Sequence, residues 1–398
     1  MNAGRNVAIC CTLSVLVLLC ATDTTAQTSS PWIFGPVLGA IGNDVVVISW
    51  ETSRSVSIDL HYGLAQVHQG SGSWSETLTF DRQKGKAEIW LHDLMPDTEY
   101  RYQLIAYEGD AVYPSKLGSF RTAAATARAF TFVVYGHTRS FPDRHKLVAD
   151  TMTRDEEGAA FVVHVGELVE SLTPDRLANF RWAIADLARS IPYLTVVGSE
   201  ATNTDAYYKG FALPQGGGTS GEEWWSFDYG SVHLIGLDST LTDPSNERAQ
   251  EQLVWLRQDL STSAAELTVV LCTASFYGSA YPTGTNEALV SLWEPVLRGG
   301  GVDLVVSGET GGYEHVYTGG IHYLTTGGGG GPLAASPNEQ IPGLVFSRYE
   351  VLHYIRITVT DNALRAEAVP VASVIDDEIY LTPSGKAIDS FVIRASAE

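Results

Sequence analysis

The chain has 398 residues, with 25 lysines and arginines against 46 aspartates and glutamates, and a formal net charge of −21. This acidity argues against nucleic acid or an anionic membrane surface as a partner, because both require a basic protein surface. The length allows two domains, since a single hydrophobic core usually stops growing at about 250 to 300 residues.

The first 26 residues predict a secretory signal peptide. An apolar run at residues 7–20 follows Arg5 and precedes the small-residue segment Thr24-Thr25-Ala26, which is typical of a cleavage site. A lipoprotein site at Cys20 is disfavoured because the bulky Leu19 precedes it. The run is too short to anchor the chain, and no membrane span is expected after it. We therefore expect a secreted or periplasmic protein.

Residues 27–122 predict a small all-β domain. Their apolar residues alternate and are often β-branched, as in the stretch from Asp44 to Trp50, and turn residues separate the stretches. The segment Leu94-Met95-Pro96-Asp97-Thr98-Glu99-Tyr100-Arg101-Tyr102 resembles the tyrosine corner of fibronectin type III domains. The resemblance implies that a tyrosine hydroxyl bonds back to the backbone here. An alanine-rich linker at residues 123–129 ends this region.

Residues 130–398 predict an α/β domain, because short apolar strands alternate with helices. In the helix expected at 174–190, Thr173 is the predicted N-cap and Pro174 the first helical residue. Further helices are expected at 249–260 and 286–297. The expected strands are 130–135, 160–165, 193–197, 232–237, 267–271 and 302–307.

Short blocks rich in glycine and polar residues follow five of these strands. Ligands of open α/β sheets bind beyond the carboxyl ends of the strands, so these blocks predict one common site. The blocks are Tyr135-Gly136-His137-Thr138-Arg139-Ser140, His164-Val165-Gly166-Glu167, Val197-Gly198-Ser199-Glu200, the segment from Thr273 to Tyr277, and Gly308-Glu309-Thr310-Gly311-Gly312-Tyr313-Glu314.

The blocks resemble those of calcineurin-like metallophosphoesterases, where they read glycine-aspartate, glycine-aspartate, glycine-asparagine-histidine, a lone histidine and glycine-histidine-x-histidine. Segments 225–239, 313–315 and 385–393 are similar to further parts of the purple-acid-phosphatase-related branch, which carries an N-terminal fibronectin-like domain. The resemblance implies a multidomain fold, with an all-β fibronectin III-like sandwich before an α/β metallophosphoesterase domain of four αββα layers.

The resemblance also implies a pair of Fe, Zn or Mn ions about 3.5 to 4 Å apart, acting on a small phosphate ester. Glu200 stands where the family has the histidine that faces the leaving group, so the family-equivalent catalytic positions are His137 and Glu200. Glu170 replaces the iron-bound tyrosine of true purple acid phosphatases. The positions equivalent to metal ligands hold His137, Glu167, Ser199, Thr273, Glu309 and Gly311.

This substituted set predicts a dismantled metal site. Gly311 offers no ligand atom, and Ser199 and Thr273 offer neutral hydroxyls, whereas such metals take carboxylate and imidazole ligands. We therefore expect no bound metal cofactor and no catalysis, as in a natural pseudoenzyme or an engineered ligand-knockout. Two alternatives stay open. The chain is an active metal-dependent phosphomonoesterase or phosphodiesterase with altered ligands, or a module that binds a cation or a protein partner.

Three carboxylates, those of Glu167, Glu200 and Glu309, are expected to share this cleft. Their mutual repulsion should raise their pKa values, so a counter-ion is required. Arg139, water or a captured divalent cation could supply it. His137 is a metal ligand, a hydrogen-bonded polar residue or a residue that only fills space.

Other polar residues of the blocks favour structural roles. His164 is expected to be a hydrogen-bonded core histidine. Cys272 remains alone once the signal is removed, so no internal disulfide is expected, and a buried inert thiol is favoured over a nucleophile. The glycine run at residues 327–331 is interpreted as a tight strand exit rather than an anion site, because no helix and lysine follow it. Three aromatic residues either line a cleft or pack in the core: Trp224, Trp225 and Tyr313.

Overall fold

The computed structural model describes residues 29–124, 129–200, 207, 210–280, 284–335, 341–360, 362–382 and 386–395. The predicted signal peptide lies outside the described residues, as does most of the predicted linker. Residues Pro31–Glu398 form one compact unit. No helix among the described residues is both long enough and apolar enough to cross a membrane.

The N-terminal part of this unit is all-β. Its six strands form one connected sheet in which the long strand β2 pairs antiparallel with β1, β3 and β4. The backbone N–H of Met95 donates to the hydroxyl of Tyr100 at 2.9 Å, which confirms the predicted tyrosine-to-backbone bond. The elements are β1 (Trp32–Ile41), β2 (Val46–Leu64), α1 (Ala65–Ser71), β3 (Glu76–Leu91), β4 (Glu99–Glu108), β5 (Ala111–Pro114) and β6 (Gly118–Arg121).

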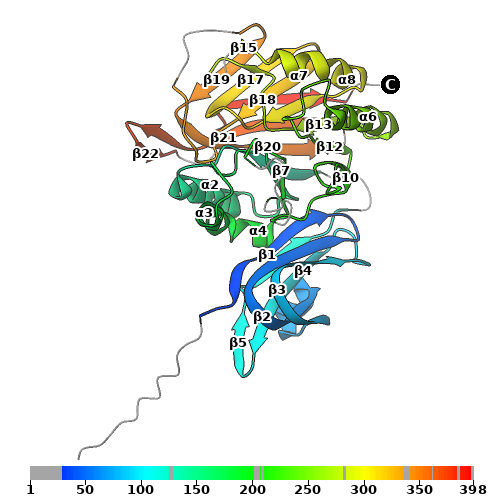
Figure 1. The fold of residues 1–398 in the computed structure, drawn as a ribbon, viewed down its shortest axis with the longest axis vertical. Coiled ribbons are helices and arrows are strands. Elements are labelled where there is room, and N and C mark those ends of the chain that lie inside the picture. Colours follow the sequence, from blue (N-terminus) through cyan, green and yellow to red (C-terminus); the bar gives the residue numbers. More distant parts are fainter. Residues whose placement is uncertain are drawn as a thin grey trace, which may run out of the picture. The chain divides into compact units, whose positions relative to one another are not determined.

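The rest of the unit is an α/β arrangement with two large sheets (Figure 1). One sheet has the order β22-β21-β20-β7-β8-β9, with β23 beside β21, and the other has the order β10-β11-β12-β13-β16-β18-β17-β19. The strands are β7 (Phe130–Tyr135), β8 (Val162–His164), β9 (Tyr193–Thr195), β10 (Gly216–Gly217), β11 (Trp224–Tyr229), β12 (Val232–Gly236), β13 (Leu267–Leu271), β14 (Tyr277–Gly278), β15 (Gly284–Thr285), β16 (Leu304–Ser307), β17 (Gly312–Thr318), β18 (Ile321–Thr326), β19 (Leu344–Tyr349), β20 (Val351–Thr360), β21 (Ala363–Ile375), β22 (Glu378–Leu381) and β23 (Asp389–Arg394).

The helices cover the outer faces of the two sheets. Successive side chains of β13 point to opposite faces of its sheet. Val269 and Leu271 belong to the core between the sheets, whereas Val270 belongs to the core beneath α6, α7 and α8. Val148 and Met152 of α2 pack on the other sheet. The α/β prediction and its layering are confirmed. The helices are α2 (Pro142–Asp155), α3 (Pro174–Ile184), α4 (Leu187–Ser190), α6 (Glu247–Thr262), α7 (Glu287–Leu292) and α8 (Glu294–Gly299).

Two predicted helices are each divided in the structure. The helix expected at 286–297 forms α7 and α8, because Pro295 has no N–H to continue the hydrogen bonds of α7. The helix expected at 174–190 forms α3 and α4. Thr173 occupies the N-cap position of α3, but its side chain makes no capping hydrogen bond. Helix α2 was not predicted, although Pro142 stands at its start.

Direct bonds join the all-β part to the α/β part. The hydroxyl of Tyr102 donates to the carbonyl of Arg189 at 2.9 Å, and the Arg189 side chain donates to the carbonyl of Leu117 at 3.0 Å. Arg181 also pairs with Glu51 at 2.8 Å. Apolar residues of both parts belong to one core cluster. The junction between the two parts is therefore packed and bonded, not a loose tether.

Candidate functional site

The five motif blocks meet at the carboxyl ends of parallel strands, as predicted. His137 follows β7, Glu167 follows β8, Glu200 follows β9, Thr273 follows β13 and Glu309 follows β16. Backbone bonds connect the blocks: the N–H of residue 137 donates to the carbonyl of residue 166 at 3.1 Å, and that of residue 308 to the carbonyl of residue 273 at 3.1 Å. The loops therefore form one continuous site.

Three non-glycine residues of the motif blocks have a left-handed backbone, and one of them is Ser140 with φ of 81°. His137 and Glu167 both have φ of 58°, a region that residues other than glycine rarely adopt. Such a conformation costs about 1 kcal/mol or more and is concentrated at functional sites, where the surrounding structure imposes it. The surrounding loops therefore impose a strained backbone at these positions.

The side chain of Arg139 is the counter-ion that the three buried carboxylates were predicted to need. A guanidinium nitrogen of Arg139 lies 2.6 Å from the carboxylate of Glu167, whose side chain is almost fully buried. The hydroxyl of Ser199 donates to the same carboxylate at 3.1 Å. Both groups that contact Glu167 therefore belong to the chain itself, and one of them carries a full positive charge.

The other two carboxylates lie within electrostatic reach of Glu167. Burial, and then the charge of Glu167, raises the pKa of Glu200 to about 7. The pKa of Glu309 is also raised, first by burial, although a bond from the N–H of Ser275 at 3.2 Å opposes the shift. The pKa values of Glu200 and Glu309 are raised as predicted, but burial is the first cause and the charge of Glu167, the predicted repulsion, adds to it.

His137 is held as a neutral imidazole. Its Nε2 lies 3.0 Å from the carbonyl of Pro332, which can only accept, so Nε2 carries the proton and Nδ1 has the lone pair. Burial, and then the charge of Arg139, lowers its pKa to about 4. Nδ1 is buried and has no hydrogen-bond partner among the described residues. Nδ1 therefore makes no well-formed hydrogen bond, although a contact with the backbone of Glu309, like that with Pro332, raises the pKa of the ring.

Two ligand-equivalent positions are closed. The hydroxyl of Thr273 donates to the carbonyl of Val197 at 2.8 Å, and the side chain packs against Gly166. At Gly311, a Cβ atom would lie 2.1 Å from the carbonyl oxygen of Pro332, so the backbone at Pro332 occupies the space of any side chain. Gly311 therefore has no space for a donor side chain, and the hydroxyl of Thr273 is engaged by the backbone.

The glycine run 327–331 closes the site from one side. The N–H of Gly329 donates to the carbonyl of Gly136 at 2.9 Å, and that of Gly331 to the carbonyl of His137 at 2.7 Å. A Cβ at Gly329 would lie 2.4 Å from the carbonyl oxygen of Gly136, so only glycine permits this approach. These amides bond the chain itself, which confirms the interpretation as a tight strand exit.

A cavity of about 330 Å³ adjoins Arg139. Glu170, which stands in place of the family's tyrosine, lies in its wall, accepts a hydrogen bond from Ser140 and pairs with Arg176. The hydrogen bond from Ser140 is the largest cause that lowers the pKa of Glu170. Glu170 is therefore engaged by Ser140 and Arg176, and among the described residues it belongs to no group of side chains placed to hold a metal ion.

The remaining candidates have structural roles. His164 is fully buried and its Nε2 lies 3.1 Å from the hydroxyl of Thr138, as expected for a core histidine. Cys272 is buried and free, and burial raises the pKa of its thiol. The undecided aromatic residues are buried and pack: the indole of Trp225 donates to the carbonyl of Thr195, and Tyr313 donates to Asp389. Trp224 is likewise buried in the core.

The donor set does not fit a pair of metal ions. Two hard cations require several carboxylate and imidazole donors around a shared space. Here the guanidinium of Arg139 is paired with the carboxylate of Glu167, and Nδ1 of the neutral His137 ring has no hydrogen bond. Thr273 is bonded to the backbone, and Gly311 has no space for a side chain. Within the described ranges, no group of three or more His, Cys, Asp or Glu side chains is placed to hold a metal ion.

Solved structures share this architecture. The purple acid phosphatase PPD1 of yellow lupin (Lupinus luteus) aligns with a TM-score of 0.72 at 16% identity, covering 90% of this chain and 74% of its own. PhoD aligns with a TM-score of 0.68 at 13% identity, covering 92% and 91%. The chain has the metallophosphoesterase fold. GAP50 of Plasmodium aligns with a TM-score of 0.55 at 16% identity, covering 68% and 90%. No family model matches the chain, and no curated protein matches it.

Proposed function

We propose that this chain is a secreted pseudoenzyme of the metallophosphoesterase fold, which binds a partner or ligand without hydrolysing phosphate esters. The observation that carries the proposal is the ion pair between Arg139 and Glu167. Glu167 stands at the position where the family bridges two cations, and the guanidinium provides its positive charge without any metal. An arginine keeps its charge under all physiological conditions.

The closed backbone at position 311 supports the same proposal. Exchange of a ligand side chain alone would leave a space that the original side chain could refill. Here the carbonyl of Pro332 and the backbone of Leu333 take that space. The absence of space for a ligand side chain at this position favours a non-catalytic site over an active site with altered ligands.

The fold has at least one partner-holding representative. GAP50, which shares the fold, is described as the anchor in the inner membrane complex of Plasmodium. By analogy of fold alone, a role in holding a partner is open to this chain. The strained loops at His137 and Glu167 and the adjoining cavity give the site a fixed shape for such a role.

We expect no metal-dependent phosphatase activity from the purified chain. Without a metal ion, water keeps a pKa near 15.7 instead of about 7, and no hydroxide nucleophile forms at neutral pH. The measurement is hydrolysis of p-nitrophenyl phosphate with added Mn, Zn or Fe, together with metal analysis of the dialysed protein. The expected result is turnover at the level of a protein-free blank and metal well below one equivalent.

The Glu167→Gln variant is the control for this assay. Turnover that chelation abolishes, and that Glu167→Gln also abolishes, would overturn the proposal in favour of an enzyme with altered ligands. Turnover that persists in the variant would come from a contaminating phosphatase and would leave the expected result intact.

A further inference from the structure

A row of hydrogen-bonded side chains joins the two large sheets of the α/β part. The hydroxyl of Tyr313 donates to a carboxylate oxygen of Asp389 at 2.7 Å, and Nδ1 of His315 lies 2.9 Å from the same oxygen. Nε2 of His315 in turn lies 2.9 Å from Nδ1 of His322. Because β17 and β18 belong to one sheet and β23 to the other, these four residues, the polar row, connect the sheets.

The ring of Phe391 on β23 packs against both histidines of the polar row. Its centroid lies 4.1 Å from that of His315 and 4.6 Å from that of His322. The ring of Tyr317 also packs against His322, at 4.5 Å. His315 is almost fully buried, whereas His322 is only partly buried, so solvent protons reach the polar row at His322.

The partners of the ring nitrogens determine where the protons are. Burial would raise the pKa of Asp389, but the bonds from His315 and Tyr313 lower it, so the carboxylate is ionised and only accepts. Nδ1 of His315 therefore carries a proton, and in the neutral ring Nε2 has the lone pair. Nδ1 of His322 donates to that lone pair, which leaves the lone pair of His322 on Nε2. A first added proton binds there and keeps every bond of the polar row.

A second proton has no such place. It would have to bind the nitrogen that accepts the bond between the two rings, so two N–H groups would face each other across 2.9 Å. Two imidazolium rings would also repel each other at a centroid separation of 5.2 Å. Burial, and then the charge of His315, lowers the pKa of His322 to about 4. The doubly protonated pair therefore cannot keep this arrangement.

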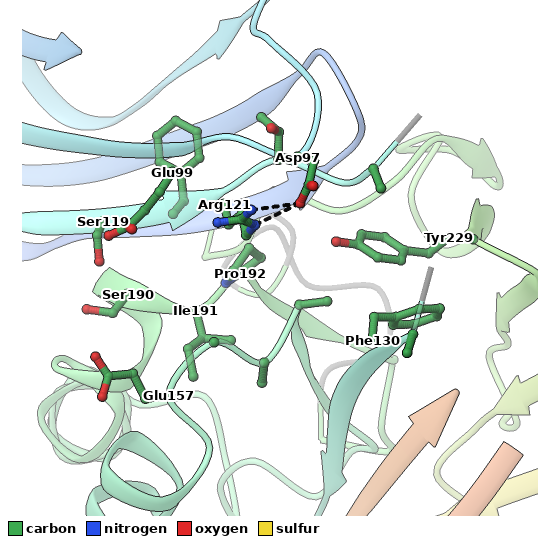
Figure 2. A pocket seen from close by; sticks show the side chains of 18 of the residues that line it. Asp97, Glu99, Ser119, Arg121, Phe130, Glu157, Ser190, Ile191, Pro192 and Tyr229 are labelled. Carbon is green, nitrogen blue, oxygen red and sulfur yellow. Dashed lines mark hydrogen bonds and ion pairs between the residues drawn. The ribbon is translucent and has the colours of Figure 1, made fainter. Parts of the chain in front are cut away.

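Groups of the neighbouring elements leave the second charge unbalanced. The carboxylate of Asp389 balances a single imidazolium. The further groups are a carboxylate that accepts from a backbone N–H, two phenols, which carry no charge at acid pH, and two charged residues that lie with Ser390 on the other face of β23: Asp303 before β16, Tyr313 and Tyr317 on β17, and Arg365 and Glu367 on β21. The charged residues of the cavity in Figure 2, where Arg121 pairs with Asp97 at 2.8 Å, form a separate group that includes no member of the polar row.

We propose that the polar row is an acid-sensitive switch, which holds β23 against β17 and β18 while the two histidines share at most one proton and releases it when both are protonated. In its own sheet β23 is paired with one strand, β21. Asp389 and Phe391 connect it to the other sheet through the two histidines. Separation of the histidine rings disturbs both of these contacts, so β23 is the element that is released.

The His322→Asn variant tests the switch by urea denaturation of the full chain. The side-chain amide of asparagine can donate to Nε2 of His315 as Nδ1 of His322 does, but it does not titrate. In the parent the pKa of His322 is about 4 when folded and 6.5 when unfolded, so the unfolded state binds more protons and stability falls as pH falls through this range. Between pH 7 and pH 4.5, the unfolding equilibrium constant of the parent should rise by about tenfold or more relative to that of the variant.

Limited digestion with pepsin at pH 4.5 locates the change. Pepsin cleaves beside aromatic residues, and cleavage at Phe391 requires β23 to leave its sheet. Mass spectrometry should show that the C-terminal peptide is lost severalfold faster from the parent than from His322→Asn. The matched control is His92→Asn, which removes an exposed histidine outside the polar row and should behave like the parent in both measurements.

Three results would overturn the proposal. If the parent and His322→Asn depend on pH in the same way, the pair accepts its second proton without cost. If His92→Asn changes the pH dependence as much as His322→Asn, the effect comes from overall charge. If the pH dependence differs as expected but pepsin removes the C-terminal peptide equally fast from both proteins, the second proton weakens the whole fold and does not release β23.

Discussion

Replacement of Arg139 by methionine is expected to lower the free energy of unfolding by about 2 to 3 kcal/mol at pH 7. Methionine keeps much of the apolar stem but leaves the buried carboxylate of Glu167 without its cation, and among the described residues the hydroxyl of Ser199 still donates to it. The loss should stay below the full cost of a buried pair, because the Arg139 side chain is 38% exposed. Urea denaturation followed by circular dichroism measures the change.

A double-mutant cycle attributes this loss to the pair. The Glu167→Gln variant removes the unpaired charge, so the double variant should recover most of the stability that Arg139→Met loses. The control is Arg154→Met, which breaks an exposed ion pair with Asp155 and should cost less than about 1 kcal/mol. If Arg139→Met costs no more than Arg154→Met, the guanidinium does not hold this site together.

The sequence predicted the general placement of the site because that placement depends on local patterns. Short apolar runs mark the strands, and the blocks that follow them lie at the carboxyl ends of parallel strands, so His137, Glu167 and Glu309 meet as expected. The acidic composition of the blocks also predicted that a counter-ion was needed. Arg139 was one of three candidates for this counter-ion. Its position two residues after His137 indicated that it could lie in the site.

The closure of the site could not be predicted. The contact of Gly311 with Pro332, and the bonds of Gly329 and Gly331 to residues 136 and 137, join segments that lie far apart in the chain. No local sequence pattern predicts which carbonyl group will fill the space of a missing side chain. The glycine run was the one visible sign, since a run of glycines often permits a close approach of backbones.

The two predicted helices that are divided in the structure also differ in cause, since one break has a local cause and the other a tertiary cause. Pro295 divides α7 from α8, and this break was visible in the sequence because proline lacks the N–H that a helix interior requires. The division of α3 from α4 has no such marker. There, Arg189 and Asp186 bond the all-β part, and these tertiary contacts lie beyond local patterns.

The Glu200→Gln variant is expected to become more stable than the parent as pH rises. The pKa of Glu200 is about 7 in the folded chain and about 4.5 when unfolded, because burial and Glu167 disfavour its ionised form. The folded state thus binds the proton more tightly, so the parent loses stability as pH rises from about 4.5 through about 7. Glutamine does not titrate and keeps an oxygen for the N–H of Leu168.

The advantage of Glu200→Gln at pH 8 should therefore exceed its advantage at pH 5 by about 2 kcal/mol, measured by urea denaturation with a chelator present. Glu222, whose pKa is also raised to about 7, titrates in both proteins and cancels in the difference. The exposed control Glu266→Gln should show a difference that does not change with pH. In the Arg139→Met background the rise should shift to higher pH, because the guanidinium charge lowers the pKa of Glu200. A Glu200→Gln difference as flat as that of the control would mean that Glu200 does not share a buried site with Glu167.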